Sequence, residues 1–113
     1  MNFSTIKKEG VCIISVLSEK LNAQIAPELK SAIVMANKEG NKNLIIDLSG
    51  ARYCDSSGLS ALLVGNRLCL EASGVFVLAG LQPIVKKVIS ITQLDKVLNI
   101  TSNVEEAEKM IFN

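Results

Sequence analysis

The 113-residue chain contains no histidine and no tryptophan. Without histidine it lacks the commonest general base at neutral pH, the usual zinc ligand and the Ser-His-Asp arrangement. Ordinary histidine-dependent hydrolases and zinc enzymes are therefore excluded, and we expect no metal site. Aromatic residues make up only 4% of the chain, which argues against stacking platforms for nucleic-acid bases.

The chain also has little net charge and no long apolar run. Twelve Lys and Arg residues oppose eleven Asp and Glu residues, and the basic residues are scattered, so we expect no direct nucleic-acid partner. The longest apolar stretches, such as Leu44–Ile46, are far shorter than the roughly 20 residues of a membrane-spanning helix. The first residues, MNFSTIKKEG, do not follow the plan of a signal peptide. These features predict a cytoplasmic protein that is not inserted into a membrane.

The cysteines are few and odd in number: Cys12, Cys54 and Cys69 are widely spaced among apolar neighbours. This pattern is typical of reduced thiols buried in a core, in a reducing compartment. Apolar residues make up 49% of the chain, and most of them are aliphatic. A chain of this length buries roughly 65% of its unfolded surface. We therefore expect residues 1–113 to form a single domain with a core of Ile, Val and Leu.

The apolar spacing alternates between strand and helix patterns along the chain. It predicts a hairpin of Phe3–Lys8 and Val11–Leu17, a helix from Ile25 that ends before Gly40, and a strand at Asn43–Leu48. A helix at Ser57–Glu71, with Leu59, Leu62, Leu63 and Leu70 on one face, precedes a strand at Val75–Leu78. Further on, the sequence predicts a helix opened by Pro83, a strand around Val97–Ile100, and a terminal helix after a capping box at Ser102–Glu105. The order predicts an α/β fold: a mixed, mostly parallel sheet of about five strands with about four helices packed on it.

The stretch from Leu44 to Leu59 runs from a buried strand through a loop into a helix. Ligand and partner sites gather at such strand ends in open parallel sheets. Ser56 is expected at or beside the helix N-cap, and Gly58 removes a side chain there, so a partner or an anion could approach the backbone closely. The same residues also fit an ordinary helix cap, and local pattern alone does not decide between the two.

The whole chain resembles the STAS-domain anti-sigma factor antagonists. The resemblance rests on the order of elements, on APEL at 26–29, on DSSGL at 55–59, on Leu81-Gln-Pro83 and on the stretch ITQLDKVL at 91–98. It implies a STAS fold and a regulator that is not itself an enzyme and needs no cofactor. By this resemblance, Ser56 is the residue phosphorylated by the cognate anti-sigma factor, which is a serine kinase. The unphosphorylated antagonist binds that kinase, phosphorylation ends the binding, and a serine phosphatase resets the cycle.

The resemblance also suggests a partner surface. Asp55, Ser57 and Gly58 would shape the switch around Ser56, and the segment Glu19–Asn22 aligns with a Gly-Glu-hydrophobic-Asp run that other members use for kinase contact and nucleotide binding. Asn22 stands where that run has a carboxylate, which disfavours a nucleotide role but keeps Asn22 in the expected partner surface. The alternative for Asn22 is a turn residue that bonds its own backbone.

Several alternatives stay open. Asp47, at the end of its strand, could line the site formed by the loops around Ser56, or its carboxylate could cap a neighbouring loop. Ser57 could be a second phosphoacceptor, although its hydroxyl is expected to bond the backbone. Cys54 could sense oxidants if a cation lowered its pKa.

Two other functions compete with the antagonist. A docking subunit of a membrane transporter, not phosphorylated, would use the same helix face. A nucleotide-binding enzyme is disfavoured because neither phosphate-loop motif, G-x-x-x-x-G-K-[ST] nor G-x-G-x-x-G, is present.

Overall fold

A five-stranded mixed sheet forms the centre of the computed structural model, which describes residues 2–112. Its strands lie in the order β1-β2-β4-β6-β7, with β1 antiparallel to β2 and the other neighbours parallel. The bounds are β1 Phe3–Lys8, β2 Val11–Val16, β4 Leu44–Asp47, β6 Phe76–Ala79 and β7 Asn99–Thr101. The predicted α/β fold with a mostly parallel sheet is confirmed.

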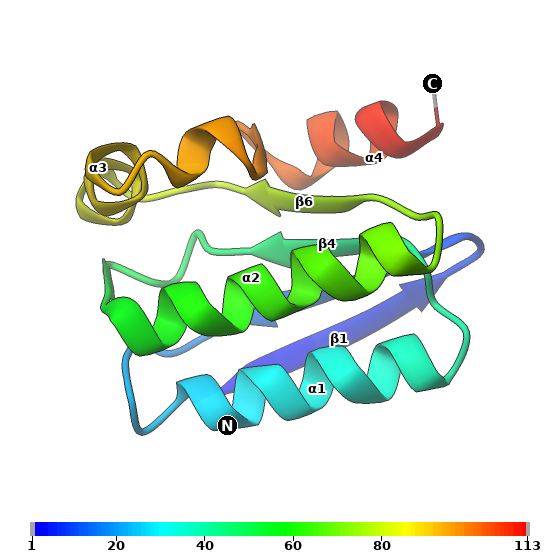
Figure 1. Cartoon of the computed structure of the whole chain (residues 1–113), viewed down its shortest axis with the longest axis horizontal. Coiled ribbons are helices and arrows are strands. Elements are labelled where there is room, and N and C mark those ends of the chain that lie inside the picture. The colour runs from blue at the N-terminus through cyan, green and yellow to red at the C-terminus, as the bar shows by residue number, and fades with distance from the viewer. Residues whose placement is uncertain (1, 113) are drawn as a thin grey trace.

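Helices cover both faces of this sheet. Figure 1 shows α1 and α2 side by side over one face, and these two helices are in extensive contact. The helices are α1 Ala26–Lys38, α2 Ser56–Glu71, α3 Pro83–Ile91 and α4 Val104–Phe112, with a 3₁₀ turn at Leu94–Lys96. α4 packs on the other face, against β4, β6 and β7.

The core is split by the sheet because side chains alternate along each strand. On one face, Cys12 and Ile14 of β2 pack with Leu44 and Ile46 of β4 under α1 and α2. On the other face, a smaller cluster contains Ile13, Ile45, Val77 and Ala107. The three cysteines are buried and free, as predicted. Within residues 2–112, no helix is both long enough and apolar enough to cross a membrane.

Two short strands form a second sheet that the sequence pattern does not reveal. β3 (Lys20–Leu21) pairs in parallel with β5 (Tyr53–Cys54), in the register Lys20↔Tyr53 and Leu21↔Cys54. A strand of two residues has no detectable period, so hydrophobic alternation does not predict it.

The buried face of α2 differs in part from the prediction. Leu59 and Leu62 are buried and Leu63 packs against the core, but Leu70 is 64% exposed. Small residues such as Gly58, Ala61 and Gly65 also face the core. A Cβ at Gly65 would lie 2.4 Å from the Phe76 ring. Leu59, Leu62 and Leu63 of the predicted stripe therefore pack in the core, and only Leu70 departs from it. Small residues between these leucines let the helix approach the sheet closely.

The cap of the terminal helix is one residue later than predicted. The side chain of Asn103, not Ser102, accepts a hydrogen bond from the main-chain N–H of Glu106, at 2.9 Å. The Glu106 carboxylate in turn accepts from the N–H of Ser102, at 3.4 Å. The capping chemistry was predicted correctly, but the residues at Ser102 and Glu105 were wrong.

Candidate functional site

The residue that caps α2 is Asp55. Its carboxylate accepts hydrogen bonds from the N–H groups of Ser57, at 2.9 Å, and Gly58, at 3.1 Å. Its backbone is extended, with φ −106° and ψ −172°, as an N-cap requires. Asp55 therefore takes up two of the N–H groups that a helix start leaves unpaired.

Ser56 follows the cap as the first residue of α2, and its side chain is exposed. The prediction that it lies beside the N-cap is confirmed, one residue after the cap itself. Ser57 is half-buried, and its hydroxyl forms no hydrogen bond with another group in residues 2–112, contrary to the expected bond to the backbone. The two serines thus differ in accessibility, and a macromolecule can reach the Ser56 hydroxyl from solvent.

Gly58 is buried, and its role differs from the one expected. A Cβ there would lie 2.5 Å from the Leu21 carbonyl oxygen and 2.7 Å from the Cys54 sulfur. The missing side chain makes room for the chain's own strands β3 and β5, not for an approaching partner or anion. Gly58 fixes how closely α2 lies on the small sheet.

The small sheet joins the two loops that the sequence singled out. After the pair Leu21↔Cys54, the main-chain N–H of Asp55 donates to the Leu21 carbonyl, at 3.3 Å. This register places Asn22 next to the start of α2. The side chain of Asn22 accepts from the N–H of Gln24, at 3.1 Å, so Asn22 is the turn residue that was the alternative interpretation.

A groove of about 410 Å³ runs between the first turns of α1 and α2, beside Ser56. Its lining residues are Ala23, Ala26, Pro27, Lys30, Ser56, Ser57, Ser60 and Ala61. Lys30 is the one cationic side chain among them, and Ser60 stands one turn after Ser56. Sequence reasoning missed Lys30 and Ser60, because their approach to Ser56 depends on how two separate helices pack. Helical spacing could have suggested Ser60 alone, four residues after Ser56.

Asp47 and Cys54 have structural roles. The Asp47 carboxylate accepts from the N–H of Ser49, at 3.0 Å, so it caps its own loop, as one alternative held. Burial, with a smaller contribution from the charge of Asp55, raises the pKa of the Cys54 thiol to about 12. A thiol with this pKa is almost entirely protonated at neutral pH, which contradicts an oxidant-sensing role. Among residues 2–112, no cluster of three or more Cys, Asp or Glu side chains could hold a metal ion.

Comparison with known proteins gives a consistent result. The family model described as STAS domain matches residues 2–107. An anti-sigma factor antagonist, BtrV of Bordetella bronchiseptica, is 24% identical over 103 residues, which cover 91% of this chain and 89% of BtrV.

Solved structures agree with the family model. The crystal structure of an anti-sigma factor antagonist from Mycobacterium paratuberculosis superimposes with a TM-score of 0.88 at 25% identity, covering 98% of this chain and 93% of that one. The Bacillus cell fate determinant SpoIIAA, in its phosphorylated form, superimposes with a TM-score of 0.73 at 19% identity, covering 96% of this chain and 98% of that one. At that identity the likeness to SpoIIAA shows a shared fold.

Proposed function

The chain belongs to the STAS domain family, and from this premise we propose that it is a phosphorylation-controlled anti-sigma factor antagonist. In its unphosphorylated form it binds an anti-sigma factor that is a serine kinase. That kinase phosphorylates Ser56, which releases the antagonist, and a serine phosphatase restores the binding form. The protein works in the cytoplasm as a binding partner, without catalysis or a cofactor of its own.

The observation that carries this proposal is the exposed Ser56 hydroxyl on an anchored helix start. A kinase needs a hydroxyl that it can reach, and Ser56 is exposed while Ser57 is half-buried. Asp55 holds the helix start by two hydrogen bonds, so the hydroxyl is presented from a defined backbone position. Support also comes from SpoIIAA, which has the same fold and for which a phosphorylated form is known.

Physical chemistry explains how one phosphate could act as a switch. Phosphorylation adds about −1.5 to −2 charges at pH 7. At a helix N-terminus the dipole favours such a charge by about 0.3–1 kcal/mol, so the domain stays folded. In a desolvated contact with a partner, an unpaired charge costs several kcal/mol. Phosphorylation of Ser56 therefore leaves the domain folded but weakens binding to the partner.

The proposed partner surface is the groove between α1 and α2 together with the loop before α1. Ser56, Ser57 and Lys30 line this groove, and Asn22 lies beside it through the pairing of β3 with β5. In this proposal Asp55 and Gly58 contribute by setting the position of the helix start.

Capture of the partner provides the first experiment. The Ser56→Ala variant, which cannot be phosphorylated at that position, serves as bait in an extract of the source organism, and Ser56→Asp serves as the matched bait. We expect a kinase of the anti-sigma type to be retained on the first bait and depleted on the second. Incubation of the captured kinase with ATP and the unmodified protein should then place phosphate on Ser56, as mapped by mass spectrometry. Phosphate mainly on Ser57, or full phosphorylation of Ser56→Ala, would overturn the assignment.

Titration calorimetry then isolates the effect of charge. Both variants lack the hydroxyl, so their difference in affinity reports the added carboxylate. We expect Ser56→Asp to bind the kinase at least tenfold more weakly than Ser56→Ala, which corresponds to about 1.4 kcal/mol. Equal affinities would contradict the charge switch and favour a docking subunit that is not phosphorylated.

A further inference from the structure

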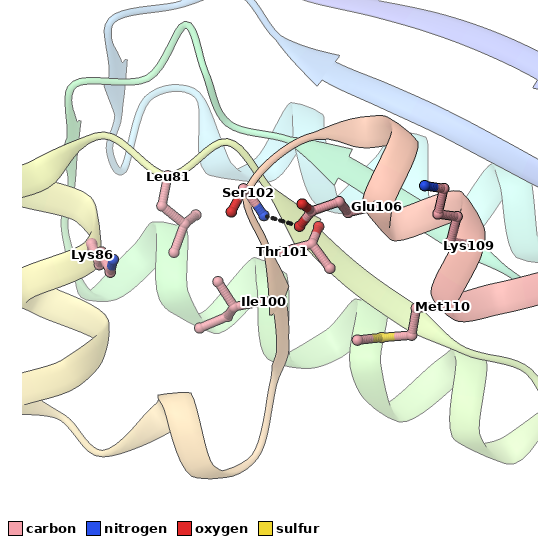
Figure 2. A pocket seen from close by; sticks show the side chains of 8 residues that line it. All are labelled: Leu81, Lys86, Ile100, Thr101, Ser102, Glu106, Lys109 and Met110. Atoms are coloured by element: carbon pink, nitrogen blue, oxygen red, sulfur yellow. Dashed lines mark hydrogen bonds between the residues drawn. The ribbon is translucent and has the colours of Figure 1, made fainter. Parts of the chain in front are cut away.

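A second groove, of about 840 Å³, lies on the other side of the molecule around the last strand of the sheet. Figure 2 shows Lys86 of α3 and Lys109 of α4 on opposite sides of β7, with Ile100 of β7 between them. The remaining lining residues are Leu81, Thr101, Ser102, Glu106 and Met110. This groove does not contain Ser56 or any other residue of the proposed switch.

The free edge of the sheet forms part of this groove. β7 is the last strand in the sheet order. It pairs with β6 on one side, and among the described residues no strand pairs with its other side. The N–H of Gly80 donates to the Thr101 carbonyl, at 3.2 Å, so the main-chain groups of Thr101 face β6. Successive residues of a strand point their main-chain groups to opposite sides. The N–H and carbonyl of Ile100 therefore face away from β6, toward the groove.

The two edges of the sheet differ in how their charged residues are paired. On β1, Lys7 forms an ion pair with Glu39, the residue after α1, and Lys8 forms one with Glu108 of α4. The charged side chains of that edge are therefore paired with carboxylates in or just after neighbouring helices. Charged residues are a common protection against unwanted strand pairing. In the described part of the chain, neither Lys86 nor Lys109 is in a salt bridge.

We propose that the groove around β7 binds an extended acidic segment of a partner protein, which pairs with the main chain of Ile100 as an added strand. Main-chain pairing with a sheet edge is an established way of recognising peptides, and side chains on alternate sides then meet the walls of the groove. Each wall offers an apolar surface and a cation: Leu81 and Lys86 toward α3, Met110 and Lys109 toward α4.

The charged side chains that line the groove favour an acidic occupant. Two ammonium groups border the groove against one carboxylate, that of Glu106. The Glu106 carboxylate also accepts the N–H of Ser102, at 3.4 Å, which holds it at the start of α4. A segment with acidic residues flanking two apolar ones fits these walls in either chain direction.

The probe is a synthetic peptide, acetyl-Asp-Glu-Leu-Val-Glu-Asp-amide, titrated into the unmodified protein and followed by ¹⁵N NMR. We expect saturable binding that shifts the Ile100 amide resonance and slows its hydrogen exchange at least about tenfold at saturation, because the amide gains a hydrogen-bond partner. The matched control peptide is N-methylated at Leu and Val, which removes the two central main-chain donors and keeps every charge. Equal binding of the N-methylated peptide, or an unchanged Ile100 amide, would overturn the proposal.

A pair of matched variants tests the cations. Replacing Lys86 and Lys109 together by Gln should raise the Kd of the peptide by about fivefold, since two favourable charge contacts are lost. Replacing Lys87 and Lys96 by Gln changes the net charge equally, but these exposed residues do not line the groove, so the Kd should change less than about twofold. Equal effects of the two double variants would contradict the proposed surface.

The same NMR samples distinguish another occupant. If raising the protein concentration alone slows exchange of the Ile100 amide, the edge pairs with a second copy of this chain, and the proposal of an acidic partner is overturned.

Discussion

Helices α2 and α4 begin with the same kind of cap and continue differently. Asp55 caps α2 and Asn103 caps α4, each through a side-chain oxygen that accepts a main-chain N–H group. The next residue in α2 is the exposed Ser56, whereas the next residue in α4 is Val104, which packs against the smaller core cluster. The comparison shows that both caps pair main-chain N–H groups of a helix start, while the residue after the cap differs in whether it faces solvent or the core.

The largest expected effect removes the close fit beneath the start of α2. Gly58→Ala would place a Cβ against the Leu21 carbonyl and the Cys54 sulfur. We expect the free energy of unfolding to fall by about 2 kcal/mol, because overpacking outweighs the better helix propensity of Ala. Urea unfolding measures the change. Ser60→Ala, at an exposed position of the same helix, is the control and should change it by less than about 0.5 kcal/mol. Unchanged stability of Gly58→Ala would show that β3 and β5 do not hold the helix start.

The two caps can be compared directly. Asp55→Ala should lower the free energy of unfolding by about 1–2 kcal/mol and Asn103→Ala by about 1 kcal/mol or less, because the Asp55 carboxylate accepts two hydrogen bonds and the Asn103 side chain accepts one. Asp55→Asn keeps an accepting oxygen and should stay close to the unmodified protein. Denaturant unfolding of the three variants gives the order, and a larger loss for Asn103→Ala would be evidence against Asp55 as the anchor of the switch.

Introducing an Asp at the position after each cap compares the two helix starts more sharply. Ser56→Asp should change the free energy of unfolding by about 1 kcal/mol or less, because the side chain is exposed and the helix dipole favours the charge, while the nearby Asp55 opposes it. Val104→Asp should lower the free energy of unfolding more than Ser56→Asp does, because Val104 is half-buried against the core. Thermal unfolding followed by circular dichroism tests both. Loss of cooperative unfolding in Ser56→Asp would mean that Ser56 belongs to the core.

The smallest expected effect concerns Lys30 in the groove beside Ser56. In protein phosphorylated at Ser56, Lys30→Gln should raise the second pKa of the phosphate by about 0.3, because a neighbouring cation favours the dianion. Phosphorus NMR titration measures this pKa. Lys38→Gln removes the same charge two turns further along α1 and should have no comparable effect. Identical shifts in the two variants would exclude Lys30 as a contact of the phosphate.

The sequence predicted the elements whose apolar residues repeat at strand or helix spacing and whose ends are marked by Gly, Pro or capping residues. The hairpin around Gly10, the helix that contains Pro27 and the parallel strands follow from alternation, helical spacing and turn residues. The position of Ser56 next to a cap was predicted, because capping depends on neighbouring residues. The pattern DSSG at the start of α2 and the pattern SNVE at the start of α4 have similar capping chemistry, so local pattern could not tell which helix start faces solvent.

The rest depends on packing between distant segments. The two-residue strands β3 and β5 are too short for any period, yet they bring Asn22 next to Asp55. The burial of Gly58 follows from that sheet, so its interpretation as an opening for a partner was wrong. On α2, Leu59, Leu62 and Leu63 face the core as predicted, whereas Leu70 is exposed, and the small residues that share the contact, such as Gly65 against Phe76, were not predicted.

The burial of Cys54 gives the switch region an intrinsic reporter. Its sulfur lies against the position where Gly58 lacks a Cβ, and its pKa is raised to about 12. In the closed structure a thiol reagent therefore meets neither an accessible atom nor an appreciable amount of thiolate. The alkylation rate of Cys54 then measures how often the start of α2 lifts from the small sheet. A change in that rate on phosphorylation or partner binding would reveal a change in local opening without an engineered cysteine or any other substitution.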